Sequence, residues 1–239
     1  MRRILITNDD GITADGIIRL AKTAKQFGEV WVVAPAAQRS AASHSISLHD
    51  PIDIFPHDFP VPGVKAFSCS GTPADCVRVG SLSVMPEKPD AVLSGVNFGY
   101  NVASDVQYSA TVGAAFEAAF QGYRAIAFSE DFAELHEVTD RYLAEILEKL
   151  LDLPPVAGEI WNVNFPCCPL AECHGILWDR TVSQGMIYKD SYKEIEALPG
   201  GGVRYMVEGE YHAEAEDGTD YRALLDGYVS VGRVKNIGF

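Results

Sequence analysis

Apolar positions in the first 150 residues follow two alternating spacings, which predict strands and helices in turn. Short apolar runs bounded by turn residues predict buried strands at residues 4–6, 30–34, 64–69, 90–94 and 125–128. Apolar residues three and four positions apart predict helices at about residues 13–28, 108–122 and 133–151, the first capped by Thr13, and Thr72-Pro73 starts a further helix. This order predicts a Rossmann-like α/β fold, in which a doubly wound, mainly parallel sheet carries helices on both faces.

The pattern changes after about residue 155, where strand-like segments punctuated by glycine replace the helices. We predict a core over residues 1–155 that carries the functional site, and an extension over residues 156–239 that lengthens the sheet and bears protruding hairpins, within one continuous domain. Residues 221–225 are expected to be extended and incompletely covered. Because exposed strand edges commonly pair with another chain, a homodimer or homotetramer is expected.

Composition narrows the class of protein. The 239 residues are 47% hydrophobic and 22% charged, as in globular proteins with a core, and the net charge of −14 argues against a nucleic acid or an anionic membrane as the main partner. No apolar run approaches the roughly 20 residues of a membrane span, and the N-terminus lacks a signal-peptide core. Five cysteines without framework spacing favour reduced thiols and a cytoplasmic location. The spacing of Cys167, Cys168, Cys173 and His174 matches no strong zinc pattern.

Two adjacent carboxylates, Asp9 and Asp10, directly follow the first predicted strand, and Gly11 then permits a sharp turn. Ligands of open α/β sheets bind beyond the carboxyl ends of the strands. Adjacent carboxylates repel each other unless a cation lies between them, so a bound metal is one interpretation. The alternative is that one aspartate caps the following helix and the other is solvated.

Further oxygen-bearing side chains follow two other strands at the same predicted edge. Ser40 lies in a serine-rich loop after residues 30–34, and Asn97 lies in a glycine-rich turn after residues 90–94. With the two aspartates they form a hard oxygen set suited to Mg²⁺, Mn²⁺ or Ca²⁺, which favours the metal interpretation.

Ordered short motifs along nearly the whole chain match one known family. They are Thr7-Asn8-Asp9-Asp10-Gly11-Ile12, Val33-Ala34-Pro35, Arg39-Ser40, Gly71-Thr72-Pro73-Ala74-Asp75-Cys76, Ser94-Gly95-Val96-Asn97, Tyr108-Ser109, Thr111-Val112, Asn162-Val163-Asn164, Gly218-Thr219-Asp220 and Gly227-Tyr228-Val229-Ser230-Val231. Together they resemble the survival protein E (SurE) family of metal-dependent nucleotidases.

The resemblance implies that Asp9, Asp10, Ser40 and Asn97 bind one divalent cation per subunit, Mg²⁺ or Mn²⁺ first, with Ca²⁺ able to occupy the site. It also implies hydrolysis of nucleoside 5′- or 3′-monophosphates, and a dimer or tetramer that exchanges C-terminal hairpins. The chain departs from the family pattern at Ala36, where Asp is usual, and at Ala41 and Ala110, where Gly is usual.

The expected chemistry follows from the cation. A metal held by the aspartate pair polarises phosphorus, lowers the pKa of bound water and offsets the protein's negative charge toward a phosphate. One of the two aspartates accepts the proton of the attacking water. Contacts to the substrate or its phosphate are expected from the side chains or nearby amides of Asn8, Thr72, Gly95, Asn101, Ser109 and Thr111.

Several rival classes fail on motif grounds. An aspartyl-phosphate phosphatase needs a second Asp two residues after the first, but Gly11 stands two residues after Asp9 and Asn8 two before Asp10. The chain also lacks the glycine motif of dinucleotide-binding folds and the Gly-Lys-Ser/Thr of P-loops. A metal-dependent nucleotide sensor that binds without turnover stays open as the alternative.

Overall fold

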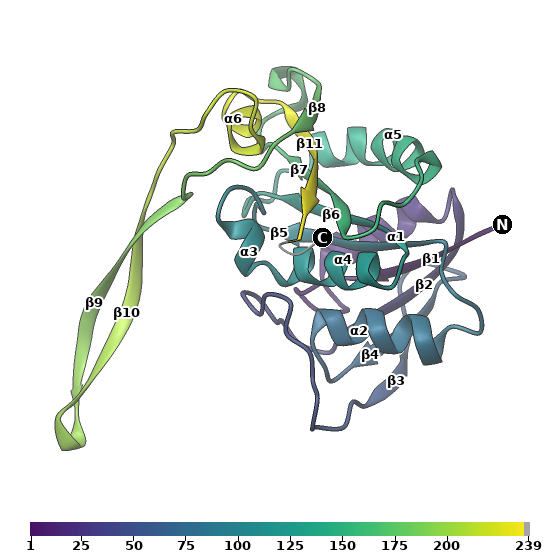
Figure 1. Cartoon of the computed structure of the whole chain (residues 1–239), viewed down its shortest axis with the longest axis horizontal. Helices are drawn as coiled ribbons and strands as arrows, with labels where there is room; N and C mark the ends of the chain where they lie inside the picture. Colours follow the sequence, from purple (N-terminus) through teal and green to yellow (C-terminus); the bar gives the residue numbers. More distant parts are fainter. Residues whose placement is uncertain (237–239) are drawn as a thin grey trace.

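Nine strands form one mainly parallel sheet in the computed structural model, which describes residues 1–236 (Figure 1). In spatial order they are β3 (Ile54–His57), β4 (Lys65–Cys69), β2 (Gly28–Pro35), β1 (Arg2–Thr7), β5 (Ala91–Phe98), β6 (Arg124–Glu130), β7 (Glu159–Phe165), β11 (Val229–Lys235) and β8 (Ile176–Arg180). The strands from β4 to β7 are parallel, while β3 and β11 run antiparallel to their neighbours β4 and β7. The predicted doubly wound α/β fold is therefore confirmed.

Helices cover both faces of the sheet, because alternate residues of the central strands point to opposite sides. Ile4 and Ile6 of β1 pack toward α1 (Asp15–Ala24) and α5 (Glu137–Asp152), whereas Leu5 packs toward α2 (Pro73–Val79) and α4 (Ala110–Phe120). The shorter elements are α3 (Asp105–Tyr108), α6 (Asp220–Leu225), a π-helical turn (Gly80–Val84) and two 3₁₀ turns (Leu170–Glu172 and Pro199–Gly201).

Two helix boundaries differ from the predictions. The N-cap of α1 is Ala14 rather than Thr13, and α5 begins at Glu137 rather than near residue 133. Neither Ala14 nor His136, the N-cap of α5, makes a side-chain capping hydrogen bond, so the strongest sequence signal for a helix start is missing at both positions.

The prediction of extended structure at residues 221–225 is wrong, because these residues form α6. The hydroxyl of Thr219 caps the helix by accepting from the backbone N–H of Arg222 at 3.4 Å. Tyr221 and Leu224, three positions apart, then pack into a small cluster with Val102. The cap and the helical spacing together outweigh the glycine-rich context that suggested a strand.

The C-terminal region belongs to the same sheet as the N-terminal one. Strands β7, β11 and β8 all lie beyond residue 155 and continue the sheet from β6, while residues 237–239 of the predicted extension lie outside the described part of the chain. None of the described helices has the length and apolar character needed to cross a membrane.

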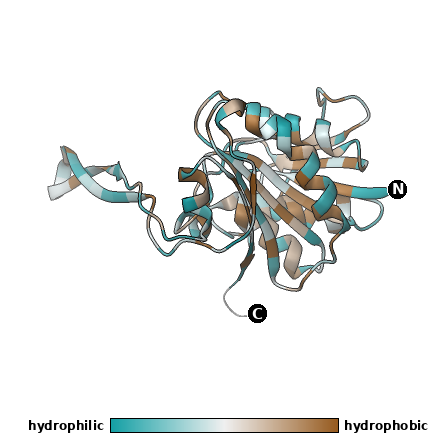
Figure 2. Ribbon diagram, turned by 90° about the horizontal axis from the view of Figure 1, so that it is seen from above, coloured by the Kyte–Doolittle hydropathy of each residue, from teal (hydrophilic) through white to brown (hydrophobic). Residues whose placement is uncertain are grey.

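A hairpin arm, made of β9 (Tyr188–Leu198) and β10 (Gly202–Tyr211), projects away from this body (Figure 1). Its strands pair antiparallel with each other through a turn in which Gly200 has φ +78°, and every residue of β10 is exposed. Figure 2 shows hydrophobic residues along the strands of the body, whereas hydrophilic residues line much of the arm. The predicted protruding hairpin is thus confirmed.

Candidate active site

Side chains from three strand ends meet at the carboxyl edge of the sheet. Asp9 and Asp10 follow β1, Ser40 lies in the loop after β2, and Asn97 is the penultimate residue of β5. Gln38 links two of these groups, since its Nε2 lies 3.0 Å from Ser40 Oγ and 3.4 Å from Asp10 Oδ1. The structure therefore brings the predicted oxygen set to one place.

Asp9 is the most enclosed member of the set, with 3% of its surface exposed. Burial raises the pKa of Asp9 to about 6, and the charge of Asp10 adds to the effect, while a hydrogen bond from Thr111 acts in the opposite direction. The Thr111 hydroxyl donates to Asp9 Oδ1 at 2.6 Å from the first turn of α4. This bond fixes the orientation of the carboxylate.

Asp10 is less deeply buried and is held by the neighbouring strand end. The backbone N–H of Phe98 donates to Asp10 Oδ2 at 3.0 Å. Burial raises the pKa of Asp10 despite that bond, and the charge of Glu130 adds to the increase. Two adjacent carboxylates with raised pKa values are an arrangement that a cation stabilises.

Asn97 presents a carbonyl oxygen to the same region. Its Nδ2 donates to the backbone oxygen of Gly99 at 2.7 Å, and no hydrogen bond described for the chain uses Oδ1. Asp9, Ser40 and Asn97 line one cavity of about 540 Å³, called here the Asp9 cavity.

Asp10 lines an adjacent cavity of about 610 Å³, whose wall also contains Arg19, Glu130 and His136. The guanidinium of Arg19 forms an ion pair with Glu130 and another with Asp140, and His136 Nδ1 lies 3.1 Å from Glu130 Oε1. These charges satisfy one another. The adjacent cavity therefore holds an ion-pair network beside Asp10, whereas the Asp9 cavity holds the other three members of the oxygen set.

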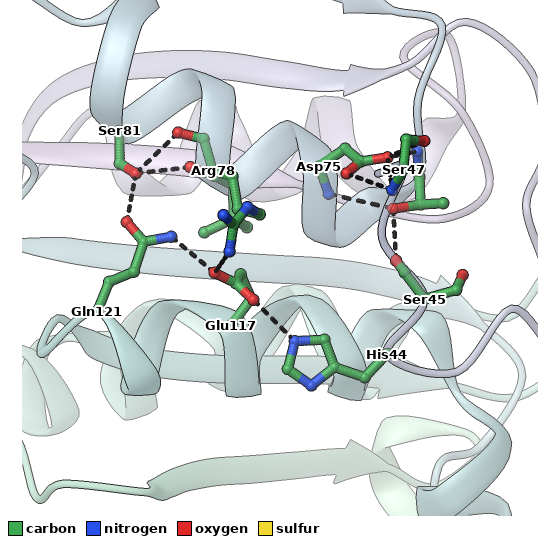
Figure 3. A network of polar contacts seen from close by, with 10 residues as sticks. His44, Ser45, Ser47, Asp75, Arg78, Ser81, Glu117 and Gln121 are labelled. Carbon is green, nitrogen blue, oxygen red and sulfur yellow. Dashed lines mark hydrogen bonds and ion pairs between the residues drawn. The ribbon is translucent and has the colours of Figure 1, made fainter. Parts of the chain in front are cut away.

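The loop that carries Ser40 is anchored on α2 and α4, and Asp75 of α2 makes the first anchor (Figure 3). Its carboxylate accepts from the backbone N–H and the hydroxyl of Ser47, at 3.0 and 2.7 Å to the nearer oxygens, and it also completes the capping box of Thr72. The Thr72 hydroxyl in turn donates to the backbone oxygen of Ser45 at 2.7 Å.

Glu117 of α4 makes the second anchor (Figure 3). Its carboxylate lies 3.0 Å from His44 Nε2 and also pairs with Arg78 at 3.1 Å. Burial acts to raise the pKa of Glu117, but the hydrogen bonds from His44 and Gln121 and the charge of Arg78 outweigh it and hold the pKa below its usual range. The Ser40 loop is thus fixed by side chains outside the cavity.

Of the six predicted substrate contacts, two line the Asp9 cavity, one contacts Asp9 itself and three lie elsewhere. Ser109 and Asn101 line the Asp9 cavity, and Ser109 also caps α4 by accepting from Val112 N–H at 3.0 Å. The amino end of α4 therefore lies at the cavity wall, where its N–H groups suit an anion. Thr111 lies in the first turn of the same helix and reaches Asp9 instead of the cavity.

The other three predicted contacts do not line this cavity. Asn8 is fully buried and donates from Nδ2 to the backbone oxygen of Gly11, which has φ +102°. Gly95 lies so close to β6 that a Cβ would stand 2.2 Å from the backbone oxygen of Phe128. Thr72 serves the cap and the loop described above.

A buried amide network supports the cavity floor and was not predicted. Asn101 Nδ2 donates to Ser129 Oγ at 2.7 Å, and the backbone oxygen of Asn101 accepts from the side chains of Asn162 and Asn164 at 2.8 and 3.2 Å. Asn162 and Asn164 are two positions apart in β7 and so lie on the same face of the strand. This spacing is visible in the sequence and could have indicated a shared polar role.

The cysteine-rich segment plays no part in this site. Cys167, Cys168 and Cys173 are free thiols, and the described residues contain no group of three or more His, Cys, Asp or Glu side chains placed to hold a metal. His174 Nδ1 lies 2.8 Å from the backbone oxygen of Asp226.

Comparison with known proteins places this geometry in a family. Residues 4–187 match the model of the family described as Survival protein SurE. The chain belongs to the SurE family. It is 40% identical to the 5′-nucleotidase SurE of Ruegeria pomeroyi over an alignment of 247 positions, which covers 96% of this chain and 92% of the relative. It is 37% identical to the 5′-nucleotidase SurE of Mesorhizobium japonicum over an alignment of 241 positions, which covers 96% of this chain and 91% of the relative.

A solved SurE structure shows the same architecture. The crystal structure of the SurE protein from Aquifex aeolicus superposes with a TM-score of 0.82 at 34% sequence identity, covering 98% of this chain and 93% of that one. Both the resemblance noted from the motifs and the fold predicted from the strand order are thus confirmed.

Proposed function

We propose that this protein is a divalent-metal-dependent nucleotidase that hydrolyses nucleoside 5′- or 3′-monophosphates to nucleoside and phosphate. The observation that carries the proposal is the Asp9–Asp10 pair, which stands at the sheet edge with Ser40 and Asn97. Asp9 borders a cavity walled by the amino end of α4, and Asp10 borders the adjacent cavity. Relatives named as 5′-nucleotidases, which this chain matches over 91% and 92% of their length, support the reaction class.

The residues present fit a single hard cation. Asp9, Asp10, Ser40 and Asn97 would hold it, because they offer two carboxylates, a hydroxyl and an amide oxygen that accepts no hydrogen bond from the described residues. Burial is the main cause of the raised pKa values of both carboxylates, and the charge of Asp10 adds to the increase at Asp9 and that of Glu130 to the increase at Asp10, so a cation would stabilise the charged pair. Mg²⁺ or Mn²⁺ is proposed, with Ca²⁺ as a possible occupant. When bound, the ion supplies Lewis acidity toward a phosphate oxygen and water.

The protein's own groups orient and stabilise the reactants. Thr111 holds the Asp9 carboxylate in place, so the charge that faces the cavity does not need to reorganise. Ser109 and the N–H groups at the start of α4 hydrogen-bond the phosphate oxygens as negative charge builds on them. One carboxylate of the Asp9–Asp10 pair accepts the proton of the attacking water.

Phosphate release from a panel of nucleoside 5′- and 3′-monophosphates, assayed with Mg²⁺, Mn²⁺ and excess chelator, tests the proposal. We expect turnover with metal, loss of turnover with chelator, and recovery when metal is added back. Nucleotide binding without phosphate release under every metal condition would instead favour a nucleotide sensor.

We also propose that the hairpin arm joins subunits into a homodimer or homotetramer. Apolar side chains such as Tyr192, Tyr205 and Met206 are 54–71% exposed on the arm. Large exposed apolar side chains on a two-stranded ribbon whose outer edges are unpaired are typical of a surface that binds another chain. Light scattering at micromolar concentration should give a mass of two or four chains, and a strictly monomeric mass would contradict the proposal.

A further inference from the structure

Cys69 and Cys76 are two free cysteines that lie in contact with each other. Cys69 is the last residue of β4, and Cys76 lies in the first turn of α2. Both side chains belong to the apolar cluster that packs the sheet against α2 and α4, and a hydrogen bond joins the two thiols. Neither the proposed reaction nor the metal site uses this pair.

The surroundings of Cys69 favour the reactive form of its thiol. The backbone N–H of Gly71 donates to Cys69 Sγ at 3.3 Å. The guanidinium of Arg39 is close by, since it donates to the backbone oxygen of Ser70, the next residue, at 2.9 Å. The hydrogen bond from Cys76, the Gly71 N–H and the Arg39 charge together lower the pKa of Cys69 against the opposing effect of burial. The thiolate that these contacts stabilise is the nucleophilic form of cysteine.

Cys76 has the complementary surroundings. It is fully buried, and burial raises its pKa well above the usual value, with the neighbouring Cys69 thiol adding to the increase. Cys76 therefore stays protonated and donates to Cys69. A nucleophilic thiol with a second thiol in contact is the arrangement in which oxidation of the first is followed by closure of a disulfide.

The segment between the two cysteines carries anchors of the loop that holds Ser40. Three of its residues bind that loop: Ser70 through Arg39, Thr72 through Ser45, and Asp75 through Ser47. Figure 3 shows the contact of Asp75 with Ser47. A change in the shape of this segment therefore reaches the Ser40 loop directly.

This segment has little room to absorb such a change. At Gly71 a Cβ would stand 2.8 Å from Asp75 Cβ, so the turn and the start of α2 pack directly against each other. Asp75 immediately precedes Cys76, and a covalent bond draws two sulfur atoms closer together than a hydrogen bond does. Closing a disulfide between Cys69 and Cys76 therefore displaces the Asp75 carboxylate from its position on Ser47.

We propose that Cys69 and Cys76 form an oxidation site at which hydrogen peroxide closes a disulfide that loosens the Ser40 loop and weakens metal binding. The oxidation goes beyond the proposed reaction, whereas its effect on the metal rests on the proposed site.

The chemistry of the site balances in two steps. The Cys69 thiolate attacks one peroxide oxygen, which gives a sulfenic acid and a hydroxide that takes up a proton to become water. The Cys76 sulfur then attacks the Cys69 sulfur, and the second water leaves. The two thiols lose two electrons and two protons, peroxide is reduced to two waters, and a thiol reductant reverses the change.

Both thiols are buried, with 1% and 0% of their surface exposed, so oxidation requires a local opening at the end of β4. The half-buried thiols of Cys167, Cys168 and Cys173 also meet the oxidant. The experiment must therefore locate the bond.

Peptide mapping locates it, because trypsin cleaves after Lys65 and Arg78 and leaves both cysteines in one peptide. After treatment with peroxide and then with an alkylating agent, this peptide should carry no alkyl group and should be lighter by two hydrogen atoms. A thiol reductant should restore alkylation at both positions. Full alkylation of this peptide after peroxide, with oxidation confined to the other three cysteines, would overturn the proposal.

Hydrogen exchange and Mn²⁺ titration measure the consequence. In the oxidised protein without metal, the Ser47 amide should exchange faster than in the reduced protein. The Kd for Mn²⁺ should rise by about 3- to 10-fold, which corresponds to the loss of about one net hydrogen bond. Unchanged exchange and affinity with the disulfide complete would overturn the proposal. Faster exchange in a protein that neither binds Mn²⁺ nor releases phosphate would show that the proposed reaction is wrong while the oxidation site stands.

Variants separate this pair from the other thiols. Cys69→Ala and Cys76→Ala each remove one partner and keep a small apolar side chain in the cluster, so peroxide should change neither Ser47 exchange nor Mn²⁺ affinity. The matched control combines Cys167→Ser, Cys168→Ser and Cys173→Ser, which leaves the pair intact and should keep the full response. Loss of the response in this control would overturn the proposal, and the mapping of the wild type does not depend on the folding of any variant.

Discussion

Asp9 and Asp220 are two buried carboxylates whose pKa values are both raised to about 6, and burial is the main cause for each. Their surroundings differ. Asp220 accepts from the backbone N–H groups of Ser183, Tyr221 and Ala103 at 2.9, 2.7 and 3.3 Å, so both of its carboxylate oxygens are used by the chain. Asp9 accepts from the Thr111 hydroxyl and borders an open cavity.

The comparison shows that a raised pKa alone does not identify a catalytic carboxylate. At Asp220 the oxygens accept hydrogen bonds from the backbone of three segments. Their acceptor geometry therefore stabilises the fold, whereas the buried charge destabilises it. At Asp9 the oxygens leave capacity for a ligand, so the role proposed for this residue depends on its charge. Substitutions that separate charge from acceptor geometry can test this distinction.

Asp9→Asn should have the largest effect, because it removes the charge and keeps the shape. We expect phosphate release to fall on the order of 100-fold or more in saturating metal. The free energy of unfolding measured without metal should be unchanged or higher, since a buried charge next to Asp10 is gone. Asp10→Asn should behave similarly, while Ser40→Ala and Asn97→Ala should be milder because water partly replaces neutral ligands.

Near wild-type turnover of Asp9→Asn would show that the pair is not the centre of the site. Asp220→Asn serves as the matched control, because it makes the same chemical change at the other buried carboxylate. It should retain activity, since Asp220 does not line the cavity.

Asp220→Ala should cause the next largest effect, on stability instead of activity. Removing both oxygens leaves three backbone N–H groups without their acceptor, and we expect a loss of about 2–4 kcal/mol in the free energy of unfolding. Asp220→Asn, which keeps one acceptor and removes the charge, should stay within about 1 kcal/mol of the wild type at pH 7. Urea unfolding measures both, and an Ala variant as stable as the Asn variant would contradict the role of the acceptors.

The pH dependence of the free energy of unfolding tests whether the charge on Asp220 destabilises the folded chain. Its pKa is about 6 in the folded chain against an ordinary value of 3.8, so between about pH 4 and 6 the folded state binds more protons than the unfolded state. Stability from this group is therefore present at low pH and is lost as pH rises to 6, by up to about 3 kcal/mol.

The relevant measurement is the difference in unfolding free energy between the wild type and Asp220→Asn at pH 4.5 and pH 6.5. The wild type should lose stability relative to the variant as pH rises. A difference that is constant, or that changes in the opposite direction, would be inconsistent with the raised pKa.

The smallest expected effect comes from Glu117, which anchors the loop that carries Ser40. Glu117→Gln weakens the pairing with His44 and Arg78, so the loop is less well fixed. The Mn²⁺ concentration for half-maximal activity should rise by about 3- to 10-fold, with little change in kcat. Glu148→Gln on the exposed face of α5 is the control. A change in kcat alone would argue against a role of the anchor in positioning Ser40.

Much of the site was predictable because strand order alone sets which residues share a sheet edge. Asp9, Asp10, Ser40 and Asn97 each follow a buried apolar run, and parallel strands place such ends together. The hydrogen bond from Thr111 to Asp9 joins residues 102 positions apart, and no local pattern encodes that pairing.

The unpredicted parts have two causes, one a local pattern that was misread and the other packing between distant segments. The prediction for residues 221–225 missed α6 because the glycines around it were taken as strand punctuation, although Thr219 supplies a regular helix cap. The wall of the Asp9 cavity joins the aromatic residues Phe98, Phe132 and Tyr188 from separate segments, so its composition became visible only in three dimensions.

The hairpin arm has a consequence for how this sequence can diverge over time. Toward its tip, the turn Pro199–Gly201 and its neighbours are nearly all exposed and contribute nothing to the core of the body, so insertions and replacements there are tolerated readily. At its root, Met186 and Tyr188 line the Asp9 cavity, and replacements there change the cavity wall. Substitutions should therefore accumulate slowly at the root of the arm and rapidly at its tip.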